Sequence, residues 1–581
     1  MLVVACVLGS MPILEMGFND DWSYTWTARA FATTGHLSYT FWAGPMVGVQ
    51  AMWAGLLIRV FGFSFTLVRL STLPLAAGCG VLLYRLGRYA GLDPRFALFG
   101  AAVVTLSPVF IPLAASFMTD VPGLFFWLAS LYCAALALRA GTVARACAWL
   151  AAAAALGVAG GTVRQVVWIV PVTALPTVAW VRRGERATLA VAAGLWCASA
   201  LAMALCLRWF HAQPNAAGGP SDSTPPLDFL KNTVESFLQI AVGCLLLVLP
   251  ILAIHLTGWR KRLREQFGDR MRIFRNWEVS PAAAGLLGGL LVSGVLLGAL
   301  LWWFQDDLLL GNIVTAYGIL DTGTEALGDK PEILTAAVRT ALGLAIFVCA
   351  GFAAAAMLDR VYRAREARLA RVSSQPQASS NSLRRFALLA IPPCLVYTLA
   401  ISYRAVVDGY LFDRYLIVLL PALVIPSLWH YQHEIRKPLP SAVWAVVGVL
   451  AWYGVATTHD HLAAGRARLQ AASALTAAGI PRTRITAGLE YDGWTQAEQT
   501  GSVHAGTNAG RTYPVDPGYW FWDFTPSIDP LYFVAYSRLE GLQDTRFKPV
   551  RYAAWLPPFR RQVYTQIAGP VGRPEDVGKA P

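Results

Sequence analysis

The sequence is poor in charged residues for its length. Asp, Glu, Lys and Arg make up 14% of its 581 residues, whereas 56% of the residues are hydrophobic. An average soluble domain has about 25% charged residues and about 45–50% apolar residues. This shortage of charge excludes an ordinary soluble protein and indicates an integral membrane protein.

Cysteine is missing from the polar end of the chain. The last of the nine cysteines is Cys394, and residues 458–581 contain none. We therefore expect neither a disulfide framework nor a zinc site. The N-terminus lacks a basic segment and a clear small-residue cleavage site, so we expect its apolar run to remain as an anchor.

Long apolar runs occur throughout the first 457 residues. They fall near 1–16, 66–84, 96–113, 121–138, 147–162, 165–181, 188–209, 233–257, 281–304, 334–357, 386–402, 414–432 and 440–457. These runs predict an all-α polytopic membrane protein with about thirteen transmembrane helices.

The net charge of +13 is concentrated in short loops between these runs. Alternate loops are basic, including 259–278 and 371–385, whereas 305–332 has six acidic residues and one lysine. This alternation follows the positive-inside rule, so we predict a cytoplasmic N-terminus and no nucleic-acid partner. The rule holds only if 46–63 does not cross the membrane, and we predict that this segment is a helix on the outer membrane surface.

The apolar runs stop after residue 457. We predict a transmembrane catalytic domain at 1–457, with an outer loop at 17–64, and a small extracytoplasmic α/β domain at 458–581. RARLQAASALTAAG is typical of a helix that ends at Gly479. RITAGLEY, LYFVAYSRL and PVRYAAWL are typical of short strands.

The middles of the predicted spans hold almost no ionisable residues. Acids and bases gather at their outer ends, namely Asp20, Asp21, Arg69, Asp120, Arg164, Arg339, Arg404, Asp408, Asp413 and Arg414. An ion-coupled transporter would be expected to place acids near the midplane. The distribution favours a site at the outer membrane boundary, with a lipid or polysaccharide transporter and a non-catalytic scaffold as alternatives.

Two acidic motifs lie on this outer side, FNDDWSY at 18–24 and SFMTDVP at 116–122. Each has a structural alternative, because Asp20 and Asp21 could cap a helix at 22–34 and Asp120 could begin another. The predicted topology places both motifs on one face of the membrane, within the first four spans. This combination favours a functional interpretation.

These residues resemble the GT-C glycosyltransferases, in particular the bacterial aminoarabinose transferases of lipid A and the protein O-mannosyltransferases. Asp20-Asp21-Trp22-Ser23-Tyr24 is similar to the Asp-[Asp/Glu]-x-x-Tyr motif of their first outer loop. Further similar stretches follow in order, VFGFSFTLVRLST at 60–72, SFMTDVP and DRYLIVLLPALV at 413–424. The stretch FWAGPMVGVQ at 41–50 departs from the family pattern, since Gly44-Pro45 has no charged residue before it.

The resemblance implies transfer of a sugar from a polyprenyl-phosphate carrier to a hydroxyl acceptor on the outer face of the bacterial plasma membrane, with inversion. The acceptor would be a lipid, glycan or protein. Asp20 would be the general base, and Asp21 and Asp120 would be further catalytic residues, with Asp120 also a candidate ligand of a divalent metal. Tyr24 would position the substrate.

Arginine can bind the phosphate of such a donor, because guanidinium contacts phosphate oxygens bidentately. The candidates are Arg164, Arg404 and Arg414, each with the alternative of a residue that snorkels to the membrane interface. His459-Asp460-His461 resembles a metal-binding pair but has no third ligand nearby in sequence, so we favour an interface position. Glu490, Asp492 and Trp494 are candidates for contact with a glycan acceptor.

Overall fold

The structure is a computed structural model of the whole chain. It describes residues 1–42, 44–216, 226–254, 285–286, 288–296, 311–320, 325–369, 378–408, 411–435, 438–504 and 519–568. The predicted basic segment at 259–278 and most of the predicted span at 281–304 lie outside these residues.

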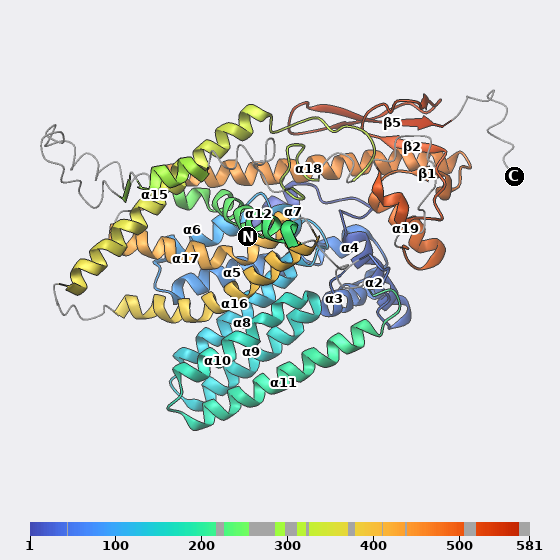
Figure 1. Cartoon of the computed structure of the whole chain (residues 1–581). Helices are drawn as coiled ribbons and strands as arrows, with labels where there is room; N and C mark the ends of the chain where they lie inside the picture. Colours follow the sequence, from blue (N-terminus) through green and yellow to red (C-terminus); the bar gives the residue numbers. More distant parts are fainter. Residues whose placement is uncertain are drawn as a thin grey trace, which may run out of the picture.

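The described part of the first 457 residues is largely helical, as predicted (Figure 1). The helices are α1 Leu2–Gly9, α2 Asp21–Thr34, α3 Gly48–Phe61, α4 Phe65–Leu70, α5 Leu73–Tyr89, α6 Pro94–Thr105, α7 Phe110–Ala114, α8 Asp120–Arg139, α9 Val143–Val163, α10 Ile169–Val181, α11 Arg186–His211, α12 Pro226–Leu247, α15 Ala336–Leu369, α16 Ala378–Asp408, α17 Leu420–His430 and α18 Ser441–Ala477. Short 3₁₀ helices at Gln165–Trp168 and Asp413–Val418 precede α10 and α17.

Seven helical segments in the described part of the chain are long and apolar enough to cross a membrane. They are Phe65–Tyr89, Asp120–Arg139, Val143–Val163, Arg186–His211, Ala336–Ala354, Asn381–Val407 and Ser441–Ala477. The chain is therefore a multi-pass membrane protein. Shorter apolar helices accompany these seven, so the predicted total of about thirteen spans stays a prediction.

The predicted N-terminal segments at 1–16 and 46–63 both contain a helix, and the two helices differ in length. The apolar run at 1–16 forms a helix of only eight residues, α1, because Met11 adopts a left-handed φ of 54° and Pro12 follows it. Eight residues extend about 12 Å, and the predicted span at 1–16 stays a prediction. The segment at 46–63 is helical as predicted, since α3 covers Gly48–Phe61 and packs against α2.

The C-terminal part is a small domain with one sheet. Its elements are β1 Ile485–Thr486, α19 Leu489–Thr500, β2 Tyr532–Ala535, β3 Gln543–Asp544, β4 Val550–Ala553 and β5 Arg560–Ile567. The sheet has the order β1-β2-β5-β3, with β4 also pairing with β5, and only β1 and β2 are parallel. Helix α18 runs without a break across the predicted domain boundary at 457–458.

The predicted C-terminal elements are largely confirmed. Helix α18 ends at Ala477, two residues before Gly479, which has a positive φ of 89°. LYFVAYSRL and PVRYAAWL contain β2 and β4. RITAGLEY was predicted as one strand, which is wrong beyond its start, because the chain turns at Gly488 with φ 103° and continues as α19.

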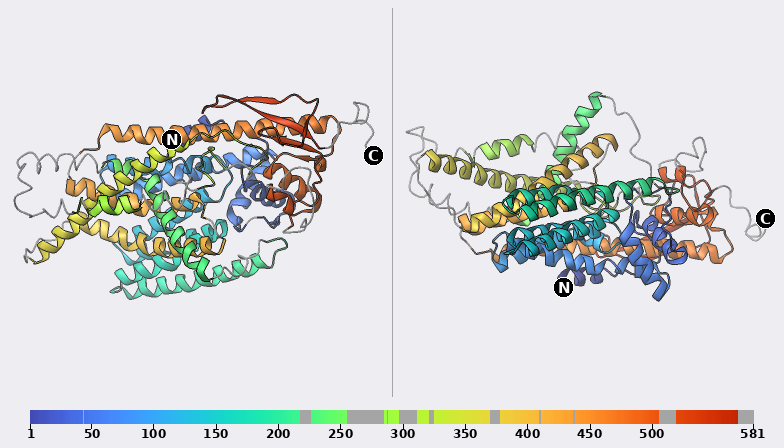
Figure 2. Two further views of the ribbon diagram at one scale, coloured as in Figure 1. Left: turned by 45° about the horizontal axis from the view of Figure 1, so that its top comes forward. Right: turned by 90° about the horizontal axis from the view of Figure 1, so that it is seen from below.

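The N-terminal segment shares a core with the C-terminal domain. Leu14, Met16 and Phe18 are buried in one apolar cluster with residues of α18 and the sheet. Trp22 is buried in a second cluster with Leu489 of α19. Helix α2 contacts α19, and Figure 2 shows from two more directions the helices that follow α1 beside this domain. The FNDDWSY motif therefore lies where the helical bundle meets the C-terminal domain.

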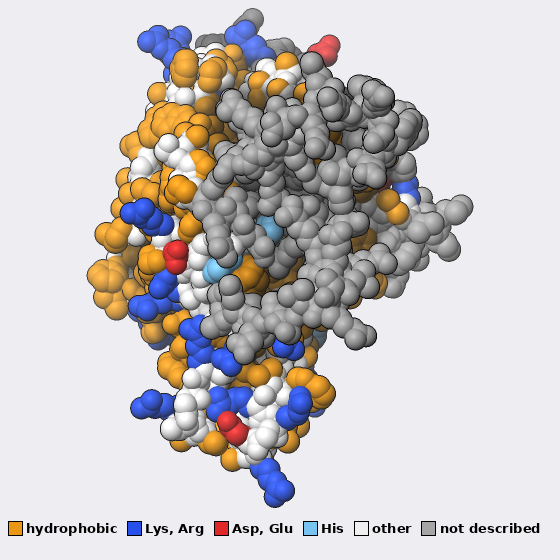
Figure 3. Space-filling model, turned by 90° about the vertical axis from the view of Figure 1, so that its left-hand side faces the viewer, with side chains coloured by type: hydrophobic (Ala, Val, Ile, Leu, Met, Phe, Trp, Pro, Cys, Tyr) orange, Lys and Arg blue, Asp and Glu red, His pale blue; other side chains and the backbone are white. Residues whose placement is uncertain are grey.

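The opposite end of the molecule has a different surface. Figure 3 shows apolar side chains along its sides and clusters of Lys and Arg at this end, with few acidic residues among the coloured atoms. Such a distribution is expected of basic loops that border an apolar, lipid-facing belt.

Candidate active site

The two acidic motifs each provide a carboxylate that pairs with an arginine. Asp20 is the N-cap residue of α2, yet its side chain makes no capping hydrogen bond. Its Oδ2 lies 3.0 Å from Nη1 of Arg414. Asp120 begins α8, and its Oδ1 lies 2.5 Å from Nη1 of Arg164. The geometry argues against capping as the purpose of Asp20 and places both acids in ion pairs.

One pocket connects these ion pairs. Asp120, Arg164 and Arg414 line it together with Gly123, Leu124, Trp127, Val166, Val167, Tyr397, Ile417 and Val418. Two buried polar atoms of this lining, Oδ2 of Asp120 and Nε of Arg414, have no hydrogen-bond partner among the described residues. An unsatisfied buried polar group costs about 1–3 kcal/mol. An acceptor and a donor left unsatisfied at one pocket indicate a polar ligand.

Aromatic rings hold the two guanidinium groups in place. The Arg164 guanidinium lies 5.0 Å from the ring centroid of Tyr415, and that of Arg414 lies 4.6 Å from Phe412. The Tyr397 hydroxyl donates to the carbonyl of Tyr415 at 2.8 Å. The 3₁₀ turn of the DRY stretch is thereby fixed against α16, and its arginine points toward Asp20.

Tyr24 of the first motif is buried close to both ion pairs. It is 4% exposed and lies near enough to interact electrostatically with Asp20, Arg414, Asp120 and Arg164. Burial raises the pKa of the Tyr24 phenol, and the Asp20 carboxylate adds to the rise. The hydroxyl therefore stays protonated and can donate a hydrogen bond.

Asp21 faces away from these pairs and binds the backbone. Its Oδ1 accepts the amide N–H of Phe18 at 2.6 Å, and its Oδ2 accepts that of Phe117 at 2.9 Å. Burial raises the pKa of Asp21 to about 6, although Arg69 and the two amides oppose the rise. Asp21 thus connects the two acidic motifs, because Phe117 lies in SFMTDVP.

The segment before Asp20 is held in an unusual conformation. The buried Arg69 guanidinium donates to the carbonyls of Pro12, Leu14 and Met16. A Cβ on Gly17 would lie 2.6 Å from the Cβ of Trp22, so only glycine fits there. Asn19 has a left-handed φ of 55°, which costs about 1–3 kcal/mol for a residue other than glycine. Such strain persists only where surrounding contacts determine the backbone.

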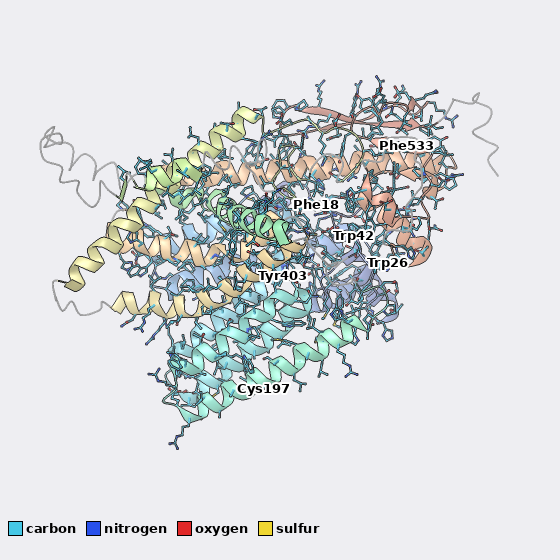
Figure 4. The ribbon with its side chains drawn as sticks, in the orientation of Figure 1. Phe18, Trp26, Trp42, Cys197, Tyr403 and Phe533 are labelled. Atoms are coloured by element: carbon cyan, nitrogen blue, oxygen red, sulfur yellow. The ribbon has the colours of Figure 1, made fainter. Side chains whose placement is uncertain are left out.

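Trp42 lies directly against Asp20. Its indole Nε1 donates to Oδ1 of Asp20 at 3.0 Å, and its ring stacks on Trp520 with centroids 5.6 Å apart. Figure 4 shows Phe18, Trp42 and Trp26 along the boundary with the C-terminal domain. Trp42 belongs to the stretch FWAGPMVGVQ, so an indole N–H contacts the motif from a segment that has no charge.

Arg404 is separate from this arrangement. It lies on α16 with an exposed side chain, and it is not among the residues that line the pocket. The motifs and topology singled out Asp20, Asp120, Arg164, Arg414 and Tyr24, which the structure brings together. Sequence reasoning missed Trp42 and Tyr397. The sequence indicated only that Trp42 lies in the predicted outer loop and that Tyr397 lies in a predicted apolar span.

A second buried charged cluster lies between α18 and the C-terminal domain. Oε1 of Glu325 is 2.5 Å from Nη2 of Arg468, and its Oε2 is 2.5 Å from Nζ of Lys330. Glu490 lies 3.2 Å from the same Arg468 nitrogen. Burial would raise the pKa of Glu325, but Arg468, His461 and Lys330 outweigh it and hold that pKa well below its usual range. Burial and Glu325 raise the pKa of Glu490 to about 7, against the effect of Arg468.

Three residues of this cluster could serve as metal ligands. Ligand atoms of Glu325, His461 and Glu490 all lie within 4.8 Å of one another. Nδ1 of His461 lies 3.5 Å from Oε2 of Glu325 and has no hydrogen-bond partner in the described part of the chain. However, both oxygens of Glu325 already accept from cations, and two carboxylates face the two cations Arg468 and Lys330. No negative charge is left to balance a divalent ion, so these residues as arranged do not fit one.

Other predictions about metal and acceptor contacts have different outcomes. Within the described ranges, Asp120 does not belong to a group of three or more converging metal-ligand side chains. His459 stacks on Trp555 with centroids 4.2 Å apart. Glu490 and Asp492 are fully buried, so the predicted contact of these two acids with an acceptor is wrong. The third ligand for His461 could not be seen in the sequence, because Glu325 and Glu490 come from distant segments.

Comparison with known families supports the resemblance. The family model for dolichyl-phosphate-mannose-protein mannosyltransferases matches residues 43–210. This stretch includes Asp120 and Arg164 and begins after the FNDDWSY motif. The match confirms the predicted similarity to GT-C glycosyltransferases. No curated protein matches the chain.

Several solved structures are similar at low identity. ArnT from Cupriavidus metallidurans in the apo state is 15% identical, with 98% of each chain covered and a TM-score of 0.37. The same protein bound to undecaprenyl phosphate is 14% identical, with 98% of each chain covered and a TM-score of 0.40. The apo oligosaccharyltransferase of Archaeoglobus fulgidus is 16% identical over 91% of this chain and 64% of that chain, with a TM-score of 0.39.

Proposed function

We propose that the chain is a membrane glycosyltransferase that moves a sugar from a polyprenyl-phosphate donor to a hydroxyl acceptor, with inversion. The reaction takes place on the outer face of the bacterial plasma membrane. The N-terminus is cytoplasmic and the C-terminal domain lies outside. The acceptor is a lipid, a glycan or a protein.

One observation carries this proposal. Asp20 and Asp120, from motifs about 100 residues apart, form ion pairs with Arg414 and Arg164, and one pocket joins the two pairs. A scaffold has no need for two buried acid–arginine pairs with unsatisfied polar atoms between them. The match to a family named for dolichyl-phosphate-mannose supports a lipid-phosphate sugar as the donor.

The two arginines suit the leaving group. When the bond between sugar and phosphate breaks, negative charge grows on the lipid phosphate, and positioned cations stabilise it. Arg414 retains an unpaired Nε beside the pocket. Arg164 and Arg414 each have further N–H groups that a phosphate oxygen can accept from. Their carboxylate partners fix the guanidinium planes before the donor arrives.

Asp20 suits the role of general base. Trp42 and Arg414 each donate to one of its oxygens, and the two contacts fix the orientation of the carboxylate. A carboxylate oxygen can accept a second hydrogen bond, so an acceptor hydroxyl can approach Asp20 without breaking either contact. Transfer of its proton to Asp20 leaves the hydroxyl oxygen free to attack the sugar carbon opposite the phosphate.

Asp120 and Tyr24 would hold the substrate. Oδ2 of Asp120 can accept from a sugar hydroxyl, or it would be a ligand for a divalent ion, which would supply positive charge near the leaving group. The Tyr24 hydroxyl can donate to a substrate oxygen between the two ion pairs. Asp21 supports the site through the backbone, and Arg404 would interact with the donor from the membrane surface.

Release of polyprenyl phosphate tests the proposal. Purified protein in lipid nanodiscs would be supplied with a panel of polyprenyl-phosphate sugars and crude cell-envelope acceptors, and free polyprenyl phosphate would be followed by mass spectrometry. We expect release by the natural protein and a loss of at least about 100-fold for Asp20→Asn, because a general base contributes roughly 10²–10⁴-fold.

Asp93→Asn is the matched control. Asp93 is an exposed acid at the start of α6, and its side chain makes no capping hydrogen bond. It should leave the rate unchanged. Absence of release from every donor would overturn the enzyme proposal and make lipid transport the next activity to measure.

A further inference from the structure

The turn that carries Asp20 is bound by the C-terminal domain. The backbone N–H of Asn19 donates to Oε1 of Glu490 at 3.0 Å, although the two residues are 471 positions apart. Glu490 is fully buried, and Asn19 is the residue with the left-handed φ of 55° directly before Asp20. This hydrogen bond therefore acts on the peptide that sets the direction of the Asp20 side chain.

Glu490 is itself fixed from two sides. Its Oε2 lies 3.2 Å from Nη2 of Arg468, which comes from α18 and is 1% exposed. Arg468 also donates to the carbonyl of Ala487, just before α19. Asp492 accepts the amide of Ala487 at 3.1 Å and the hydroxyl of Thr486 at 2.6 Å. Arg468 thus supports Glu490 directly, whereas the hydrogen bonds of Asp492 join residues within the C-terminal domain.

The remaining contacts of this segment come from the helical bundle. Arg69 binds carbonyls up to Met16, and Asp21 binds the amide of Phe18. Asn19 lies between these anchors, and its amide is satisfied from the C-terminal domain. A buried amide that lost its acceptor would cost about 1–3 kcal/mol, so a backbone conformation in which this amide reaches another acceptor would become favourable.

We propose that Glu490 is a positioning residue for Asp20, so that the C-terminal domain completes the candidate active site by holding the Asn19 peptide. The inference rests on the proposed function of Asp20. In this proposal the C-terminal domain contributes to the reaction through Oε1 of Glu490, which accepts the Asn19 amide. Glu490 itself does not contact the substrate.

Three variants separate positioning from general stability. Glu490→Gln keeps a carbonyl oxygen that can accept from Asn19. Glu490→Leu has a similar volume and no acceptor. Asp492→Asn changes a fully buried acid on the same turn of α19, which accepts hydrogen bonds from Thr486 and Ala487 within the C-terminal domain. All three would be compared in nanodiscs at equal amounts of folded protein, with melting temperatures measured in parallel.

The kinetic result expected is specific. Glu490→Leu should lower kcat about 10- to 100-fold with little change in the donor KM, because a small displacement of a catalytic group reduces the rate more than binding. Glu490→Gln should retain kcat within about 3-fold, which corresponds to less than about 1 kcal/mol. Asp492→Asn should lower the melting temperature and leave kcat unchanged. A folded Glu490→Leu protein with natural kcat, or an equal loss in Asp492→Asn, would overturn the proposal.

Hydrogen exchange provides a readout that does not depend on activity. Peptides covering residues 12–22 should exchange faster in Glu490→Leu than in the natural protein, while Asp492→Asn and Glu490→Gln should leave them protected. If Glu490→Leu does not fold, the exchange of these peptides in Glu490→Gln becomes the test. Faster exchange in Glu490→Gln than in the natural protein would contradict the proposal, because this variant keeps an acceptor for the Asn19 amide. If the natural protein transfers no sugar, the proposed function fails, while the exchange result still decides whether Glu490 holds the turn.

Discussion

Asp20 and Arg414 form an ion pair of 3.0 Å across 394 positions of sequence. The acid is the N-cap residue of α2, and the arginine lies in the 3₁₀ turn before α17. Both side chains are largely buried. Because a buried charge is costly without a partner, each residue depends on the other, and the pair fixes the beginning of the chain against one of its last membrane segments.

Replacement of the arginines should affect donor binding first. Arg414→Lys and Arg164→Lys keep the charge but lose the planar fork that matches a phosphate group. We expect the donor KM to rise about 10-fold or more in each variant, since tenfold corresponds to about 1.4 kcal/mol. Initial rates over a range of donor concentrations would measure this change. Arg29→Lys, at a partly exposed site on α2, is the control and should leave KM unchanged; equal KM values in all variants would contradict a phosphate role.

The neighbouring acids of the first motif should behave differently. Asp20→Asn should lower the rate strongly, and it should also lower stability because the buried Arg414 loses its charged partner. Asp21→Asn should lower stability, because an amide group has one acceptor oxygen for the two backbone N–H groups that Asp21 binds. The unsatisfied contact should cost about 1–3 kcal/mol. Thermal unfolding in detergent and turnover in nanodiscs would be measured for both variants, and a stable Asp21→Asn protein without activity would instead give Asp21 a direct chemical role.

Several features of this arrangement follow from sequence. The helical membrane class follows from composition, and the outer position of the acidic motifs follows from the alternation of basic loops. These two inferences pointed to Asp20, Asp120, Arg164 and Arg414, which the structure brings together in pairs. Local rules also accounted for the end of α18, because Gly479 favours a helix end.

Other features depend on contacts that no local pattern shows. The cluster of Glu325, Arg468 and Glu490 combines an outer loop, the end of a long helix and the C-terminal domain. Each residue alone looks like a solvated charge in sequence. The early end of β1 was misjudged because the composition of RITAGLEY outweighed the breaking effect of Gly488, where φ is 103°. Tertiary packing decided both the cluster and the position of Trp42.

The acids of α19 should make stability fall as pH rises. Burial raises the pKa of Glu490 and of Asp492 to about 7 each, from ordinary values near 4. Between about pH 4 and about pH 7, the folded state therefore binds more protons than the unfolded state. The contribution of these two acids to the free energy of unfolding is fully present below about pH 4 and is lost as pH rises through about 7. Glu325 has the opposite sign, with a lowered pKa, so its contribution is lost only when pH falls below about 4.

Melting temperatures between about pH 5 and 8 would test this sign. We expect a decrease of a few degrees toward pH 8 in the natural protein and a flatter profile in Glu490→Gln. Glu498→Gln, a change at a partly exposed acid on the same helix, should keep the natural slope. A melting temperature that rises from pH 5 to pH 8 would show that Glu490 and Asp492 are ionised in the folded protein at every pH tested.

Removal of divalent ions should leave the proposed reaction largely intact. Arg164 and Arg414 already place two positive charges beside the pocket, where the leaving phosphate needs them. The cluster of Glu325, His461 and Glu490 has its negative charge balanced by Arg468 and Lys330, so a chelator has no tightly bound ion to extract there. We expect less than about a threefold change in polyprenyl phosphate release after treatment with EDTA, a difference of under 1 kcal/mol in the barrier. A complete loss of release that Mg²⁺ or Mn²⁺ restores in the natural protein, but not in Asp120→Asn, would instead assign Oδ2 of Asp120 to a metal ion. This oxygen is a buried carboxylate atom of the pocket and has no hydrogen-bond partner among the described residues.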